Sequence, residues 1–226
     1  MAVGHPLDLL QGEPLVLLDQ AVYVPDYQAL LLSDVHLGKA ETFQMAGIPI
    51  PQQVNGETLE RLRSHYNQVN PQRIFILGDL FHSRQGMVTE IIDAWSEFLK
   101  PIDAQVTLIV GNHDRAALTP VFDMQYSTEP ISLGRLLLSH EPVNQATIPK
   151  GHLNICGHIH PVVKLKSAID SLRLPCFYHE HPSQRLTLPS FGSFTGGYEV
   201  AIGKGKTAYI IVEGCLMILD NSSEIS

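Results

Sequence analysis

The chain has 226 residues, of which 44% are hydrophobic, and a net charge of −8. Its length and apolar content suit one sizeable α/β domain with a buried core, and we expect residues 1–226 to form a single domain. The acidic balance argues against a protein that coats nucleic acid or anionic membranes non-specifically, since that mode needs a basic surface, but it allows a local basic or metal-charged site.

The start of the chain lacks the features of a signal peptide, and no apolar run approaches the length of a membrane span. We therefore expect a cytoplasmic protein without a membrane partner. The three cysteines, Cys156, Cys176 and Cys215, are far apart and form no C-x-x-C pair. This argues against a disulfide framework or a thiolate zinc site, and we expect three buried free thiols.

The first predicted elements are strands. Residues 15–18 and 21–24 are apolar and flank a polar pair, which predicts a hairpin. A turn at Pro25 and Asp26 leads into another apolar strand at residues 30–32. The following segment, 38–51, ends in a proline-rich sequence, and we expect a long ordered loop there.

Two helices are expected in the first half of the chain. Apolar residues recur at helical spacing after Asn55, a predicted N-cap, until Pro71 ends the run, and again over residues 91–99 before Pro101. Each helix precedes an apolar strand, at residues 74–77 and 106–110. This β-α-β-α-β order favours right-handed crossovers onto one sheet.

The second half is rich in short strand-like segments joined by turns. The strand candidates are residues 162–166, 172–178, 185–188, 198–202, 208–212 and 216–219. The glycine-rich segment 192–197 lacks the strand-loop-helix context of a phosphate-binding loop, so we interpret it as tight backbone packing. We expect His179-Glu180-His181 to be a solvated turn and residues 221–226 to be frayed.

Five apolar strands end in side chains that can bind metals. Asp34 and His36 follow residues 30–32, Asp79 follows 74–77, Asn112 follows 106–110, His140 follows 136–138, and His158 and His160 follow 153–156. Because open α/β sheets bind ligands at the carboxyl ends of their strands, we expect these side chains to meet. One such pattern is a weak indication, since a lone histidine is more often structural; five in this order are a strong one.

The seven donors are carboxylates, imidazoles and one amide, with no thiolate. This set suits Mn, Fe or Zn, and we expect Mn first. One tetrahedral ion would not use seven donors, whereas two divalent ions about 3.5–4 Å apart would use them all. His158 and His160 would share one face in a strand, whereas a turn would distribute them over both ions. The residues thus predict a dinuclear hydrolase of phosphate esters.

These motifs resemble the calcineurin-like metallophosphoesterases, whose order is matched by Asp34-Val35-His36, Gly78-Asp79, Gly111-Asn112-His113-Asp114, His140 and Gly157-His158-Ile159-His160. The resemblance implies one ion held by Asp34, His36, Asp79 and His160 and another held by Asp79, Asn112, His140 and His158. Asp79 would bridge them. It also implies a four-layer α/β fold, with two mixed β-sheets packed face to face and flanked by helices.

Blocks outside the metal motifs are similar to the bacterial DNA ligase-associated metallophosphoesterases. They include His36-Leu37-Gly38-Lys39-Ala40, Leu174-Pro175-Cys176-Phe177 and the stretch 188–197. The resemblance implies a phosphodiester substrate, DNA or a nucleotide, and a functional association with DNA repair proteins. Nuclease action or DNA end processing is therefore the expected activity.

The expected mechanism begins with a hydroxide that bridges the two ions and attacks phosphorus in line. His113 would contact the phosphoryl oxygen or protonate the leaving group, and Asp114 would orient His113 and raise its proton affinity. The alternative is that His113 only supports the metal site. Lys39 and Arg115 are candidates for contact with substrate phosphate, or else are solvated loop charges.

His82 departs from the pattern of the broader family, which often has Asp three residues after the bridging Asp. We expect His82 to hold a metal ligand in place, and we count it with Lys39 and Arg115 among the candidate substrate contacts. The alternative is a loop residue that caps the end of its strand.

Three other functions fit part of the pattern. Nucleotide-sugar or nucleotide pyrophosphate hydrolases share the Ser-Asp-x-His start, but the Gly-Asn-His-Asp form and the C-terminal blocks count against them. A non-catalytic protein-binding scaffold would have lost metal ligands or His113, and this chain retains them. A metal-dependent amidohydrolase barrel would need eight β-α units in a longer chain.

Overall fold

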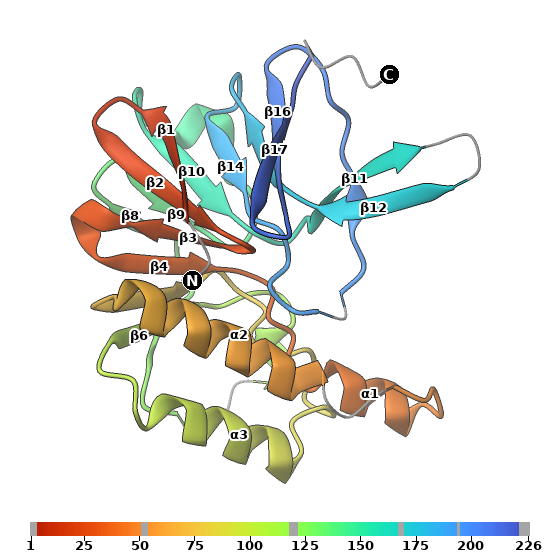
Figure 1. Cartoon of the computed structure of the whole chain (residues 1–226). Helices are drawn as coiled ribbons and strands as arrows, with labels where there is room; N and C mark the ends of the chain where they lie inside the picture. Colours follow the sequence, from red (N-terminus) through yellow and green to blue (C-terminus); the bar gives the residue numbers. More distant parts are fainter. Residues whose placement is uncertain (1–3, 51–53, 118–121, 167–169, 194, 222–226) are drawn as a thin grey trace.

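The computed structural model describes residues 4–50, 54–117, 122–166, 170–193 and 195–221 (Figure 1). Their strands form two seven-stranded sheets and one three-stranded sheet. None of the described helices is both long and apolar enough to span a bilayer.

The first sheet has the order β1-β2-β3-β4-β5-β6-β7. Strands β1 to β4 are antiparallel, and β4 to β7 are parallel. The carboxyl ends of β4, β5 and β6 therefore lie at one edge of the sheet. The strands are β1 (His5–Leu10), β2 (Glu13–Leu18), β3 (Ala21–Val24), β4 (Ala29–Leu32), β5 (Arg73–Ile76), β6 (Gln105–Ile109) and β7 (Gln125–Ser127).

Two long helices, α2 (Val54–Val69) and α3 (Thr89–Leu99), cover the outer face of this sheet (Figure 1). The fully buried Leu62, Trp95 and Phe98 pack in one cluster with strand residues such as Leu30 and Ile74. This apolar stripe on each helix explains the helical periodicity of the sequence. Shorter helices are α1 (Lys39–Met45), α4 (Asp114–Ala117), η1 (Pro25–Tyr27) and η2 (Gln145–Thr147).

The second sheet has the order β17-β16-β13-β14-β10-β9-β8, and the third has the order β12-β11-β15. Within the second sheet, β10 runs parallel to β9 and β14. The strands are β8 (Ile131–Leu133), β9 (Leu136–Leu138), β10 (Leu153–Cys156), β11 (Pro161–Lys166), β12 (Ser171–Pro175), β13 (Phe177–Glu180), β14 (Arg185–Thr187), β15 (Tyr198–Glu199), β16 (Lys206–Val212) and β17 (Cys215–Leu219).

The two large sheets pack face to face. Leu17 and Leu31 of the first sheet share a buried cluster with Leu138, Ile155 and Leu186 of the second. A separate cluster joins the third sheet to the outer part of the second. The expected α/β fold, with mixed sheets packed together and flanked by helices, is therefore confirmed.

The segment after His36 is more regular than we expected. Residues 39–45 form helix α1 instead of an irregular loop, because the prolines of this segment begin only at Pro49. The N-cap expected at Asn55 is also wrong, since this residue lies inside α2. Its side chain instead accepts from the backbone N–H of Gly38 and donates to Glu41, which ties α2 to the start of α1.

Three expectations for the second half are also wrong. The strand predicted at residues 172–178 is two strands, because the chain passes from the third sheet to the second at Cys176. His179 and Glu180 belong to β13, which has a neighbour on both sides, and His179 is buried, so only the exposed His181 lies in the expected solvated turn. Cys156 and Cys176 are buried as expected, whereas Cys215 is exposed. The frayed end expected at residues 221–226 lies, except for Asn221, outside the described residues.

Candidate metal centre

The loops that follow β4, β5, β6, β9 and β10 meet where the two large sheets are packed together. In the first sheet, the backbone N–H of Asp34 donates to the carbonyl oxygen of Gly78 at 3.0 Å. In the second, Gly157 donates in the same way to His140 at 2.9 Å. The parallel pairing of these strands therefore continues into the loops and brings their side chains together.

Two glycines allow the loops of the two sheets to approach each other. A Cβ atom on Gly78 would lie 2.1 Å from Nδ1 of His140, and one on Gly157 would lie 1.6 Å from Oγ of Ser33. Each glycine thus faces a residue of the opposite sheet. A larger residue at either position would push the two halves of the centre apart.

The backbone at the centre is held in an uncommon conformation. Ten described residues other than glycine have a positive φ, and five of them are proposed ligands: Asp34, His36, Asp79, His158 and His160. Left-handed backbone at side chains of this size costs energy and persists where the surroundings impose it, often at functional sites. Its concentration here supports a functional role for the cluster.

Asp34, His36 and His160 form the first group of donors, whose ligand atoms all lie within 4.8 Å of one another. Nε2 of His160 is 3.0 Å from Oδ1 of Asp34 and 3.4 Å from Nε2 of His36. The other oxygen of Asp34 accepts from the backbone N–H of His158 and from Ser33. Oδ1 is thus the oxygen that faces the group.

Asp79, His140 and His158 form the second group, with the same 4.8 Å limit between ligand atoms. Oδ1 of Asn112 lies 3.0 Å from both Nε2 of His140 and Nδ1 of His158, so the amide belongs to this group. Oδ2 of Asp79 is 3.5 Å from Nε2 of His140 and 4.0 Å from Nε2 of His36. Asp79 therefore lies between the two groups.

Two of the histidines are oriented by backbone carbonyls. Nδ1 of His140 donates to Leu77 at 2.9 Å, and Nδ1 of His160 donates to Gly196 at 3.1 Å. A carbonyl oxygen only accepts, so Nδ1 carries a proton in each ring. In the absence of an ion, Nε2 of His160 is the donor to Oδ1 of Asp34, and this bond outweighs burial and raises the pKa of His160. With an ion bound, Nε2 of both rings would supply the lone pair, as in metal-binding histidines.

Burial sets the charge of the first group. It lowers the pKa of His36 to about 2, so this ring is neutral and able to donate a lone pair to a metal. Burial alone would raise the pKa of Asp34, but the hydrogen bond and charge interaction with His160 hold it below its ordinary value. A neutral imidazole and an ionised carboxylate are the protonation states that divalent ions require.

The sequence profile of the calcineurin-like phosphoesterases matches residues 27–203, a span that includes every donor described above. The chain belongs to the calcineurin-like phosphoesterase family. The crystal structure of the Pseudomonas putida nuclease MPE is similar to this phosphoesterase, with 34% sequence identity, a TM-score of 0.82 and coverage of 96% of this chain and 100% of that one. This is consistent with the DNA ligase-associated subgroup and a metal-dependent phosphoester hydrolase.

Two other solved structures are more remote. Yfce, a phosphoesterase from E. coli, is 16% identical at a TM-score of 0.43 and covers 88% of this chain and 96% of that one. A Vps29 double mutant from Entamoeba histolytica is also 16% identical, at a TM-score of 0.34, with coverage of 84% and 96%. Both scores are too low to support an argument. No curated protein sequence matches the chain.

His113 and His82 lie beside the first group of donors in this phosphoesterase. The ring of His113 is 5.1 Å from that of His36 and stacks on that of His82, with centroids 4.9 Å apart. Nδ1 of His82 lies 3.4 Å from Nδ1 of His36. His82 therefore contacts a proposed metal ligand, and His36, His82 and His113 are themselves close enough together to hold an ion.

The expectation that Asp114 orients the ring of His113 is wrong. Nδ1 of His113 instead donates to the carbonyl oxygen of His82 at 2.6 Å. The fully buried carboxylate of Asp114 accepts from the backbone N–H groups of Asp79, Phe81 and Gly111, at 2.7, 3.0 and 3.0 Å. It therefore joins the loops after β5 and β6, and holds Asp79 and Asn112 in register.

The two basic candidates lie beside different groups of donors. Lys39 is half-buried and borders a narrow hollow with His36. Burial is the main cause of the lowered pKa of both His36 and His82, and the charge of Lys39 adds to it. Arg115 is exposed and borders a hollow of about 230 Å³ with His140. Both side chains are therefore near the centre, on the sides of the first and second group respectively.

Ser190 and Gly192 contact the backbone of the loop that carries Asp34, a role that we did not predict for the segment 190–197. Oγ of Ser190 and the backbone N–H of Gly192 both donate to the carbonyl oxygen of Asp34. A Cβ on Gly192 would lie 2.4 Å from the carbonyl oxygen of Val35, so the expected tight packing is confirmed. Ser33 and Ser190, which hold Asp34, were not predicted; the serine before Asp34 was the only signal for either.

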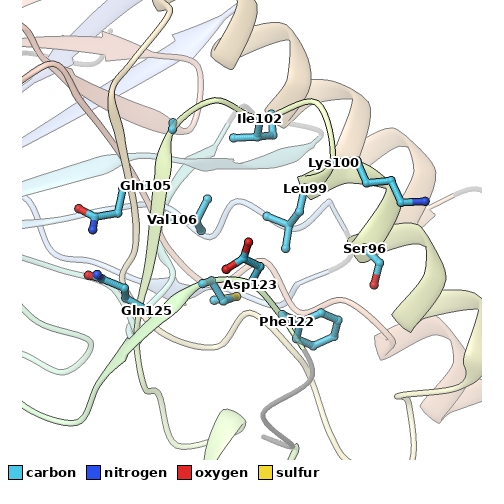
Figure 2. Close-up of a pocket in the computed structure, with 11 residues that line it drawn as sticks. Ser96, Leu99, Lys100, Ile102, Gln105, Val106, Phe122, Asp123 and Gln125 are labelled. Atoms are coloured by element: carbon cyan, nitrogen blue, oxygen red, sulfur yellow. The ribbon is translucent and has the colours of Figure 1, made fainter.

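A larger hollow of about 640 Å³ lies between α3 and the strands β6 and β7 (Figure 2). It is bordered by Gln105 and Val106 at the start of β6, whereas the metal-binding candidates follow the end of that strand. Among the described residues that line it, Asp123 and Lys100 are charged and none is a histidine. The hollow therefore lies at the opposite end of β6 from the metal-binding candidates.

Proposed function

We propose that this phosphoesterase uses two divalent ions, Mn²⁺ first, to hydrolyse phosphodiester bonds in nucleic acid. The observation that carries the proposal is the position of Asp79 between two groups of donors. The first ion would be held by Asp34, His36, Asp79 and His160, and the second by Asp79, Asn112, His140 and His158. The single carboxylate shared by both sets would keep the ions close enough to act on one phosphate.

The donors fit such ions once Nε2 of His160 gives up the proton that it shares with Asp34. His140 and His160 keep their protons on Nδ1, and Nε2 of His160 faces Nε2 of His36 at 3.4 Å. Burial raises the pKa of Asp79, and a cation between the rings and the carboxylates would favour the ionised form of Asp79. Oxygen and imidazole donors without sulfur suit Mn²⁺, with Fe or Zn²⁺ as alternatives.

Two bound ions supply positive charge for the phosphoryl oxygens and lower the pKa of water. His113 then has the remaining task, which is to interact with the phosphate. Its Nδ1 proton is held by the carbonyl of His82, so Nε2 is the atom that exchanges a proton. In its protonated form, Nε2 would donate to a phosphoryl oxygen or to the leaving oxygen.

The open surface of the centre favours a polymeric substrate. Asn112 and His158 are exposed, and the hollows that border the two groups have volumes of about 10, 60 and 230 Å³. Enclosed sites for small ligands usually measure about 300–1,000 Å³. Together with the similarity to a nuclease, this supports a nucleic-acid strand over a free nucleotide, and a role in DNA repair alongside repair proteins is the setting we propose.

The test is a panel of substrates assayed with Mn²⁺. It should include an aryl phosphodiester, an aryl phosphomonoester, cyclic nucleotides, and single- and double-stranded DNA. We expect hydrolysis of the aryl diester and of DNA, and loss of both activities when the ions are removed with a chelator. Ions bound without turnover of any substrate would contradict the proposal and favour a scaffold.

A further inference from the structure

The hairpin formed by β11 and β12 begins at the metal centre and extends away from the two large sheets (Figure 1). Its first residue, Pro161, directly follows the proposed ligand His160. A chain of n residues spans at most about 3.5 Å × n, so Lys164 is within about 14 Å of His160 along the strand and Lys166 within about 21 Å. Both are within reach of a polymer whose phosphate is bound at the centre.

One face of this hairpin is basic. Lys164 pairs directly with Arg173 across the two strands, and Lys166 lies two residues further along β11, on the same face. Lys166 and Arg173 are exposed, and Lys164 is half-buried. Val163 and Leu174, on the other face, pack against the second sheet. The apolar face thus anchors the hairpin, and the basic face is turned to solvent.

Lys164, Lys166 and Arg173 form no ion pair with a carboxylate among the described residues. Within the described part of the chain, the ion pairs of lysines and arginines involve Lys100, Arg135, Arg185 and Lys206. Glu199 lies on the neighbouring strand β15, opposite Val162, and pairs with none of the three cations. Like charges directly opposite each other destabilise an antiparallel pair, so the Lys164–Arg173 pair has a cost that an anion would offset.

We propose that the basic face of Lys164, Lys166 and Arg173 binds the phosphate backbone of a single nucleic-acid strand and guides it to the metal centre. This inference rests on the proposed function and specifies where the polymer lies. A local positive surface is needed because the chain as a whole has a net charge of −8 and would otherwise repel a polyanion. Arg173 also donates to the carbonyl of Gly197, which fixes one end of the face beside His160.

The test compares two double variants with equal changes in charge. Lys164→Gln/Lys166→Gln removes charge from the hairpin. Lys100→Gln/Lys150→Gln removes the same charge from exposed positions that precede β6 and β10, whereas the metal-binding candidates follow these strands. Arg173 is left intact because its bond to Gly197 would confound the result. Affinity for a short single-stranded oligonucleotide is measured by fluorescence anisotropy in EDTA over a range of salt concentrations. Hydrolysis of an aryl phosphodiester in Mn²⁺ then shows whether the metal centre of each variant is intact.

We expect the hairpin variant to bind the oligonucleotide about tenfold more weakly at 0.15 M salt. The slope of log affinity against log salt should also become smaller in magnitude by about 1.4, which is about 0.7 for each of the two lost phosphate contacts. The control variant should bind as the wild type does, and both should hydrolyse the aryl diester normally. Equal slopes and affinities for the two variants would overturn the proposal.

Failure of the proposed function would be seen separately. If the wild type binds the oligonucleotide through the hairpin but never cleaves nucleic acid in Mn²⁺, the assignment of the substrate is wrong. If the wild type cleaves DNA and the hairpin variant binds it normally, only the role of the hairpin is refuted.

Discussion

His113 and His82 are joined by a hydrogen bond and by a stacked pair of rings. Nδ1 of His113 donates to the backbone carbonyl of His82 at 2.6 Å, and the ring centroids are 4.9 Å apart. The bond selects the tautomer of His113 and leaves Nε2 for the substrate. The ring of His82 also approaches Nδ1 of His36 at 3.4 Å, so His82 couples the proposed catalytic histidine to a proposed metal ligand.

Replacing His113 should reduce turnover without removing the ions. We expect His113→Ala to lower kcat on an aryl phosphodiester by about 10²–10⁴-fold, the usual contribution of proton transfer by a positioned side chain. Metal content, measured by elemental analysis after gel filtration, should equal that of the wild type. Wild-type turnover with full metal content would remove His113 from the mechanism.

The ring of His82 has two contacts that substitutions can separate. His82→Ala loses both the stack on His113 and the approach to His36, whereas His82→Phe retains an aromatic ring for the stack. We expect both to reduce metal affinity by about 10–100-fold, as loss of a ligand's supporting contact does. Only His82→Ala should also lower kcat at saturating metal. Equal kcat values in the two variants would show that the stack has no positioning role.

Gly78 can be tested against a glycine with the same backbone conformation. Gly78 and Gly12 have φ values of 83° and 84°, but a Cβ on Gly78 would meet His140 at 2.1 Å, while one on Gly12 would meet nothing within 4 Å. Both alanine variants should lose about 1–2 kcal/mol from left-handed strain. Only Gly78→Ala should also lose affinity for the second ion, measured by calorimetric titration. Wild-type metal affinity in Gly78→Ala would refute the close approach of the two sheets.

The three cysteines should react at different rates. Burial raises the pKa of both Cys156 and Cys176 to about 12, whereas Cys215 is exposed. At pH 8 a disulfide reagent should therefore titrate one thiol rapidly in the native protein and three in denaturant, because only a thiolate reacts. Cys215→Ser should abolish the rapid phase. A rapid phase that persists in this variant would contradict the burial of the other two.

The fold could be predicted from the sequence where the patterns are local. Apolar runs gave the strands that end at the metal centre, and helical spacing gave α2 and α3. The helix at residues 39–45 was obscured by prolines that follow it, and the break at Cys176 depends on which sheet each strand joins. Which sheet a strand joins is decided by partners distant in the sequence, so the residue type at Cys176 does not predict the break.

The proposed ligands could be predicted because each follows an apolar strand, but their supporting contacts could not. The bond from His113 to His82 joins a side chain to a backbone carbonyl 31 residues away, and any residue at position 82 could accept it. For the same reason, sequence proximity assigned Asp114 to His113, whereas its carboxylate binds three backbone N–H groups. Backbone partners leave no signature in a sequence.

The shared position of Asp79 is the central claim, and the number and spin coupling of bound Mn²⁺ ions test it most directly. Titration of the metal-free protein, followed by electron paramagnetic resonance, should show two ions per chain with a spin-coupled signal, because a bridging carboxylate keeps them about 3.5–4 Å apart. Asp79→Ala should abolish the coupling. A single ion per chain in the wild type, or two ions without coupling, would contradict a dinuclear centre.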